Sequence, residues 1–322
     1  MFGELPKLLG KTFLIGYLLP AALIILSAAA LLDLYKYSSI YSWGLGILGS
    51  ADEKQLAFRL GLAVVIAWAA GVLLLSINHN LIRLLEGYGP FNPARLLKCW
   101  SSRAFDKLVA EDKAIEAKRV DGKIPPDLRG DHSRVRARLG NEFPEEKRLL
   151  LPTRFGNVIR AFERYPQVTY GIEAIHTWPR LQALIPESYT GLLEDAKAQL
   201  DFWVNLWFGF AVLAVGTLGF LAYSRQYSLG LVFAVAVVLA MAAAKVGQTA
   251  AAQWGVLVKG AFDLYRGELC KQIGLEMPRS VESERQMWTR VSQTFLFRRP
   301  EYAEKLTVFR PLRVEEDRAT GA

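Results

Sequence analysis

The chain has 322 residues, of which 52% are hydrophobic, with 39 Lys and Arg against 31 Asp and Glu and with two cysteines. Two cysteines exclude a disulfide-stabilised scaffold, and the hydrophobic share excludes a disordered chain. The mean hydropathy is +0.18 although 22% of the residues are charged, so apolar and charged residues must be segregated along the sequence.

Four stretches contain no charged side chain and are long enough to cross a membrane. They comprise residues 13–32, 60–78, 202–224 and 227–244. About 20 apolar residues at a rise of 1.5 Å per residue span a hydrocarbon core of about 30 Å. The sequence therefore predicts an all-α polytopic membrane protein with four transmembrane helices in two helical hairpins. The first stretch has an alternative interpretation as a signal peptide because Lys7 and Lys11 precede it, but its apolar run exceeds the usual length of about 7 to 15 residues.

The charges lie in the segments between and beyond these spans. The predicted segments are an N-terminal tail at 1–12, a loop at 33–59, a helical domain at 79–201, a tight turn at 225–226 and a C-terminal helical region at 245–322. Four spans return the chain to its starting side, so the tail, the helical domain and the C-terminal region share one side, which holds 35 of the 39 Lys and Arg residues. Because positive charge near span ends favours the cytoplasm, we expect a bacterial-type inner-membrane protein with both termini cytoplasmic.

The first half of the 79–201 domain is expected to contain one helix followed by one flexible loop. Residues 94–120 have helical periodicity, which predicts one helix with its apolar residues roughly on one side. These apolar residues are Leu97, Trp100, Ala104, Leu108 and Ile115. Residues 121–144 are polar, lack periodicity and contain three prolines, which predicts a flexible loop.

Capping residues and periodicity predict the helices that follow. Thr153 is expected to cap a helix with a strong apolar face. From Glu187 the helical pattern enters the third span directly. Ser283 followed by Gln286 predicts a capping box for a helix through Thr294.

Small residues recur at every fourth position in two spans. They are Ala63, Ala67 and Gly71 in the second span and Ala236, Ala240 and Ala244 in the fourth. In lipid such stripes let helix backbones approach closely, which favours packing within the bundle or between copies, although alanine-rich composition alone is an equal alternative. Leu74 is expected to lie off the stripe.

Polar residues are scarce within the spans. Asn205 and Thr217 are the clearest intramembrane polar candidates. None of the spans contains an ionisable side chain, which disfavours an ion-coupled transporter because such proteins usually carry ionisable groups at membrane depth.

No catalytic, cofactor-binding or metal-binding residues are predicted. Residues 44–49 match the pattern GxGxxG, but they follow a span instead of a strand, so no dinucleotide site is expected. The histidines, His79, His132 and His176, have no cysteine or acidic partner at metal-ligand spacing. The positive charge is spread thinly, which suits an anionic lipid surface better than nucleic acid and fits an ordinary solvated surface best of all.

These features favour a non-enzymatic anchor and assembly protein, in which four helices hold a cytoplasmic interaction domain. Its expected partners are the lipid bilayer, a protein bound by that domain, and further copies of the chain if it is a homo-oligomer; no nucleic acid and no cofactor are expected. The alternative is an oligomeric channel or membrane-perturbing effector, because uncharged linings can gate pores by dewetting. A membrane-bound enzyme of unknown type is the third hypothesis.

Overall fold

The computed structural model describes residues 10–34, 53–89, 92–224 and 229–311. Helices account for 84% of these residues, and no strand occurs among them. Four helices are long and apolar enough to cross a membrane, which confirms an all-α polytopic membrane protein. The predicted turn at 225–226 and the GxGxxG match at 44–49 lie outside the described residues.

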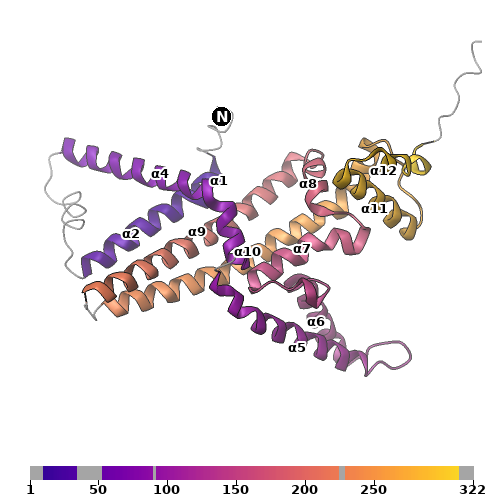
Figure 1. Ribbon diagram of the computed structural model, residues 1–322, viewed down its shortest axis with the longest axis horizontal. Helices are drawn as coiled ribbons and strands as arrows, with labels where there is room; N and C mark the ends of the chain where they lie inside the picture. The colour runs from indigo at the N-terminus through magenta and orange to yellow at the C-terminus, as the bar shows by residue number, and fades with distance from the viewer. Residues whose placement is uncertain (1–9, 35–52, 90–91, 225–228, 312–322) are drawn as a thin grey trace, which may run out of the picture.

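The four apolar helices lie side by side (Figure 1). The first comprises α1 (Lys11–Phe13), a π-helical turn η2 (Leu14–Leu18) and α2 (Leu19–Leu34); the others are α4 (Glu53–Glu86), α9 (Glu187–Ser224) and α10 (Leu229–Gln272). α9 and α10 form one long pair, and α2 and α4 pack against α9 and against each other. As predicted, α9 begins at Glu187 and runs unbroken into the third span.

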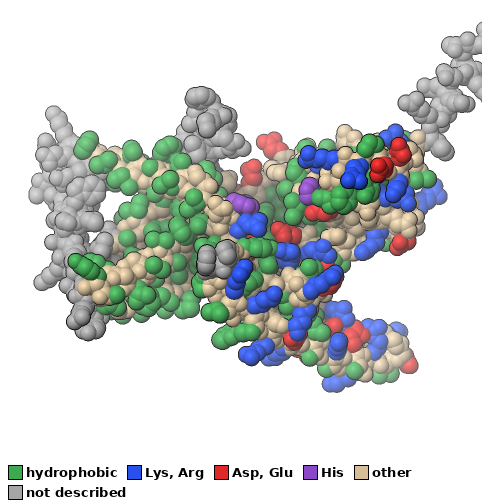
Figure 2. Space-filling view, in the orientation of Figure 1, with side chains coloured by type: hydrophobic (Ala, Val, Ile, Leu, Met, Phe, Trp, Pro, Cys, Tyr) green, Lys and Arg blue, Asp and Glu red, His purple; other side chains and the backbone are tan. Residues whose placement is uncertain are grey.

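The outer surface of the spans is apolar. Leu26 is 65% exposed, Val215 is 71% exposed and Leu231 is 68% exposed. Figure 2 shows hydrophobic side chains covering this end of the molecule, while Lys, Arg, Asp and Glu gather over the other end. An apolar surface of this extent is rare on a soluble protein, whereas contact with lipid accounts for it.

The other ends of α9 and α10 support a helical body. α7 (Arg154–Tyr170) and α8 (Ala174–Gln182) pack against α10, and α11 (Val281–Phe297) packs against both of them. α6 (Arg129–Glu142) packs against α7, α5 (Lys98–Glu116) against α6, and α12 (Pro300–Glu304) against α11. Short 3₁₀ turns are η3 (Pro93–Leu97), η4 (Pro126–Leu128), η5 (Lys147–Leu149) and η6 (Thr307–Phe309). One hydrophobic core runs from Leu74 and Leu81 on α4 to Trp288 on α11. The body is therefore built on the same helices that cross the membrane.

The helix caps match the sequence in one place and differ in another. Thr153 caps α7, because its Oγ1 accepts a hydrogen bond from Gly156 N at 2.9 Å. The cap of α11 is Ser280, whose Oγ accepts from Ser283 N at 3.1 Å. The predicted cap at Ser283 is therefore wrong by one turn, because Ser280 offers the same side-chain acceptor three residues earlier.

α5 and α6 form an arm that projects from the body (Figure 1). Its own small core contains Leu108, Ile115, Val135, Phe143 and Leu150. The predicted flexible loop at 121–144 is wrong, because most of it is α6. Val135, Leu139 and Phe143 recur every four residues, and this narrow apolar stripe suffices for a helix that leaves its other faces in water.

The start of the arm departs from the predicted pattern. Leu108 and Ile115 are buried as their spacing indicates, whereas Leu97 is 47% exposed and Trp100 is 69% exposed. Leu96, beside them in η3, is 80% exposed. These three apolar side chains are therefore exposed, and they follow the end of α4 by 10 to 14 residues.

The small residues of the second span differ in their packing. Gly71 is buried against the first helix: a Cβ there would lie 3.2 Å from Phe13 Cζ and 3.3 Å from Leu18 Cα. Ala63 and Ala67 are only half-buried. Leu74, which is not part of the stripe, is itself buried in the core, so it is no neutral comparison for Ala67.

On α10 the small residues face α9. Ala236 and Ala240 are buried, and Ala244 is half-buried. The buried stripe continues through Ala243 and Gly247, because a helix with 3.6 residues per turn keeps one face when steps of three and four alternate.

Candidate functional site

A buried hydrogen-bond network joins three membrane helices where their spans meet the body. The Asp201 carboxylate on α9 is 2% exposed; it accepts from Tyr17 Oη at 2.7 Å and from Asn78 Nδ2 at 2.9 Å. Lys197, one turn earlier on α9, donates to Asp201 Oδ1. A charge this deeply buried is tolerated only when it is paired and hydrogen-bonded. The network therefore fixes the relative heights of the first three spans.

A second polar contact lies one turn deeper. Asn205 is fully buried, and its Nδ2 donates to the carbonyl oxygen of Gly16 at 2.8 Å. In an α-helix that carbonyl would accept from residue 20, which is Pro20 and has no N–H. Asn205 thus supplies a donor to the first span beside a gap in its backbone hydrogen bonding, and that first span is π-helical at Leu14–Leu18.

Thr217, the other predicted polar candidate, bonds to its own helix. Its Oγ1 donates to the carbonyl oxygens of Leu213 at 2.8 Å and Ala214 at 3.0 Å. The hydroxyl of Thr217 is thereby satisfied within α9, so Asn205 and Thr217 take part in separate contacts.

A cleft of about 560 Å³ opens beside the Asp201 network, between the span ends and the body. We call it the boundary cleft. Its charged lining consists of Arg83 and Glu86 from α4, Arg160 and Glu163 from α7, and Lys197 from α9. In Figure 2 the Lys and Arg side chains begin at this junction.

The three cations of the cleft come from different helices. The Arg83 guanidinium lies 4.5 Å from the centre of the Tyr88 ring, and Arg160 Nη2 donates to the Tyr88 hydroxyl. Lys197 Nζ lies 5.7 Å from the centre of the Trp254 ring. Two guanidinium groups thus flank one tyrosine, and the ammonium group enters the same cleft from α9.

The two carboxyl groups of the cleft take up protons readily. Glu86, the last residue of α4, is 8% exposed; burial, reinforced by Glu163, raises its pKa to about 7 against the effect of Arg83 and Arg160. Burial also raises the pKa of Glu163, opposed by Arg160 at 3.8 Å. Ionisable groups tuned in this way cluster at functional sites.

The cleft also contains polar atoms that no described residue satisfies. They are Asn78 Oδ1, which is buried beside Asp201, and Arg160 Nε. Nearly all buried polar atoms in proteins have a hydrogen-bond partner. A small side-chain rotation that turned these two buried atoms toward the cleft would therefore let them bond a ligand without breaking an existing hydrogen bond.

An apolar side pocket of about 220 Å³ adjoins the cleft. The two share Phe162, Glu163, Ile175 and Trp254, and the side pocket adds Ala174, Trp178, Val258 and Phe262. The Phe162 and Trp254 ring centres are 5.2 Å apart, and those of Trp178 and Phe262 are 5.9 Å apart. We call this the aromatic side pocket. Charged and aromatic walls therefore meet in one continuous space.

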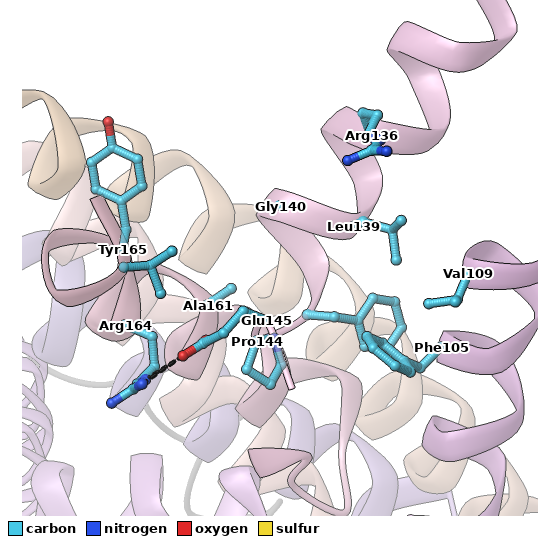
Figure 3. Close-up of a pocket in the computed structure, with 12 residues that line it drawn as sticks. Phe105, Val109, Arg136, Leu139, Gly140, Pro144, Glu145, Ala161, Arg164 and Tyr165 are labelled. Atoms are coloured by element: carbon cyan, nitrogen blue, oxygen red, sulfur yellow. Dashed lines mark hydrogen bonds and ion pairs between the residues drawn. The ribbon is translucent and has the colours of Figure 1, made fainter. Parts of the chain in front are cut away.

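A separate groove of about 320 Å³ lies between the arm and α7 (Figure 3). Phe105 and Val109 from α5 and Leu139 from α6 point into it. At its edge Arg164 Nε donates to Glu145 Oε1 at 2.9 Å. We call it the arm groove; its apolar floor and charged rim suit an apolar helix face or side chain of another protein.

Within the described residues, no three His, Cys, Asp or Glu side chains are placed to hold a metal ion. Burial raises the pKa of the Cys270 thiol to about 11, so this cysteine is unreactive near neutral pH.

We expect Glu86→Gln to stabilise the detergent-solubilised protein at about pH 8 and to change little at about pH 5. The pKa of Glu86 rises on folding to about 7 from an ordinary 4.5, so the folded state loses stability as the pH rises through that window. Each pKa unit corresponds to about 1.4 kcal/mol, and the glutamine amide has no charge to bury. Thermal unfolding across this pH range measures the effect.

Glu268→Gln is the matched control, because Glu268 is exposed on the same body and pairs with Lys271. It should keep the wild-type dependence of stability on pH. If Glu86→Gln keeps that dependence as well, the Glu86 carboxyl does not titrate in the way its burial indicates.

No single segment of the sequence points to the boundary cleft. Asp201 falls just before an uncharged span and Asn78 ends another, so each reads as an ordinary span flank. A lone amide and a lone acidic residue, Asn78 and Asp201, at the ends of two spans on the same side were the available signal.

No protein-family model matches the chain, and no curated protein or solved structure is significantly similar to it.

Proposed function

We propose that this chain is an inner-membrane anchor and assembly protein that holds a protein partner at the cytoplasmic surface through its helical body. The observation that carries the proposal is the arm: two charged helices with their own small core, standing away from the body and leaving an apolar groove against α7. A structure that only anchored the chain would not need this projection.

The continuity of α9 and α10 supports an anchoring role. Both helices cross the apolar region and then form the central pair of the body, so no flexible linker separates the spans from the arm's support on α7. The spans and the arm therefore move as one unit, so a protein bound by the arm is held at a fixed position relative to the membrane. The excess of Lys and Arg on the body side of the spans favours a cytoplasmic body with both termini in the cytoplasm.

The channel alternative is less well supported. A pore without charged lining needs polar side chains or width for selectivity, and the two clearest polar side chains of the spans are already engaged. Asn205 donates to Gly16 O, and Thr217 donates to carbonyls of its own helix. No specific observation among the described residues favours conduction.

We expect photo-crosslinking residues in place of Val109 or Leu139, which line the arm groove, to give one discrete adduct in intact cells. The same residue at Ala114, exposed on α5 and outside the groove, should give none. Leu139→Glu should abolish the adduct formed from Val109, since a carboxylate in the apolar floor opposes burial of an apolar surface. Blotting and mass spectrometry identify the product.

The adduct mass separates the possible occupants. A product at twice 36.0 kDa means that the groove holds a second copy, and any other mass means a different protein. Adducts equal in yield at Val109 and Ala114, or unaffected by Leu139→Glu, would contradict the groove as a binding surface and with it the assembly role.

A further inference from the structure

The position of the boundary cleft restricts what can enter it. Tyr17, Leu75 and Leu200 line it, and all three lie at or near span ends. Phospholipid phosphates lie at this depth, on either side of the hydrocarbon core. A molecule diffusing in the cytoplasmic leaflet would therefore carry its headgroup to the mouth of the cleft.

The charge of the cleft selects an anion. Its cationic side chains are Arg83, Arg160 and Lys197, of which Lys197 is paired with Asp201. Burial favours the neutral forms of the opposing carboxyls of Glu86 and Glu163, which weakens their opposition to an anion beside Arg83 and Arg160.

The free hydrogen-bond donors of the cleft match phosphate oxygens. Arg160 Nε is buried without a hydrogen bond, with Glu163 Oε2 3.8 Å away, and the Arg83 guanidinium lies 4.5 Å from the centre of the Tyr88 ring. Guanidinium groups bind phosphate through two parallel N–H donors, which gives strength and direction. A protonated Glu86 would add an O–H donor beside them.

The aromatic side pocket lies beyond the charged layer. Val258 and Phe262 follow Trp254 by four and eight residues on α10, about 6 and 12 Å farther from the span at 1.5 Å per residue. An apolar group seated there is outside the hydrocarbon core. A lipid merely surrounding the spans would leave this pocket unused, whereas a molecule with both a headgroup and a chain would fill both spaces.

We propose that the boundary cleft is a phospholipid-binding site, in which Arg83, Arg160 and Lys197 hold the headgroup phosphate and the aromatic side pocket takes part of an acyl chain. The shared chemistry is a phosphate ester; the side pocket favours a lipid over a soluble phosphate as its source. This binding is separate from the arm groove, so either assignment can fail without the other.

The test is a native mass spectrometry titration of delipidated full-length protein in detergent micelles. The probes are phosphatidylglycerol, a diacylglycerol with the same chains and no phosphate, and inorganic phosphate as a competitor. We expect phosphatidylglycerol to bind and diacylglycerol to bind at least about tenfold more weakly, since charge-assisted hydrogen bonds are lost. Millimolar inorganic phosphate should not displace the lipid.

Three substitutions sharpen the test. Arg83→Gln and Arg160→Gln should each weaken phosphatidylglycerol binding about tenfold or more. Arg164→Gln is the control, because Arg164 lies one turn along α7 from Arg160 and pairs with Glu145 outside the cleft. Should Arg160→Gln fail to fold, Arg83→Gln decides.

A fourth variant tests the side pocket. Trp178→Ala should weaken lipid binding, because it removes an aromatic wall that only the chain contacts. Equal binding of diacylglycerol, or binding that survives Arg83→Gln, would overturn the phosphate assignment. Full displacement by inorganic phosphate would assign the cleft to a soluble phosphate compound and overturn the lipid assignment.

Discussion

Asp201→Ala should cause the largest loss of stability of any single substitution considered for this protein. It leaves Tyr17 Oη, Asn78 Nδ2 and the Lys197 ammonium without their common acceptor in a buried position. Removing one member of a buried ion pair typically costs about 3–5 kcal/mol. Thermal unfolding of the solubilised protein should show a fall on the order of 10 °C.

The control is Asp195→Ala on the same helix. Asp195 pairs with Lys11 at 2.7 Å, but its side chain is 47% exposed and that of Lys11 is 67% exposed. Exposed pairs contribute about 1 kcal/mol or less, so this variant should unfold close to the wild type. Comparable losses in the two variants would mean that the Asp201 network does not hold the spans together.

Gly156→Ala should separate the body from the second membrane helix. A Cβ at Gly156 would lie 2.6 Å from the carbonyl oxygen and 3.0 Å from the Cα of Glu86, and both are backbone atoms of α4 that cannot rotate away. Thr153 ties the same junction, since its Oγ1 donates to Leu85 O at 2.8 Å and accepts from Gly156 N. We expect a loss of about 3 kcal/mol, at the upper end for overpacking, and a disturbed boundary cleft.

Gly191→Ala serves as the comparison in an exposed part of α9. No atom lies within 4 Å of the Cβ that it would add, so alanine should be neutral or stabilise the helix by up to about 1 kcal/mol. Detergent melting curves of both variants measure the difference. If Gly156→Ala melts with the wild type, α4 and α7 are not in the close contact described.

Features that depend on long runs of similar residues were predictable from the sequence. The four spans follow from uncharged stretches of about 20 residues, because buried helices of soluble proteins rarely contain uncharged stretches of that length. The continuity of α9 follows from a helical pattern that runs from Glu187 to the span at Asp201 without an intervening proline. Thr153 was recognisable as a cap because an apolar helix face begins directly after it.

The predicted flexible loop at 121–144 failed because helix α6 depends on a partner helix that the local sequence does not reveal. α6 carries four arginines between Arg129 and Arg138, and a polar segment of this kind resembles a disordered one when its partner helix is unknown. Its order comes from Val135, which is 1% exposed against α5. The narrow apolar stripe of Val135, Leu139 and Phe143 stabilises α6 only when α5 packs against it.

The candidate site could not be predicted because it depends on contacts between distant residues. Tyr17, Asn78 and Asp201 belong to three helices, and only the lateral packing of the spans brings them within hydrogen-bonding distance. The pairing of Arg83 with Arg160 around Tyr88 likewise requires the Gly156 junction.

Because of the hydrogen bond from Asn205 to the Gly16 carbonyl, the first span cannot complete its contacts until the third span has been synthesised. Asn205 follows Pro20 by 185 residues, so at about 5 to 20 residues per second the ribosome needs roughly 10 to 40 s to produce it. During that interval the first helix is in the bilayer without its side-chain donor, where an unmet carbonyl is costly. The N-terminal helix therefore gains this donor only after the third has been inserted, so the first span completes its packing late in synthesis.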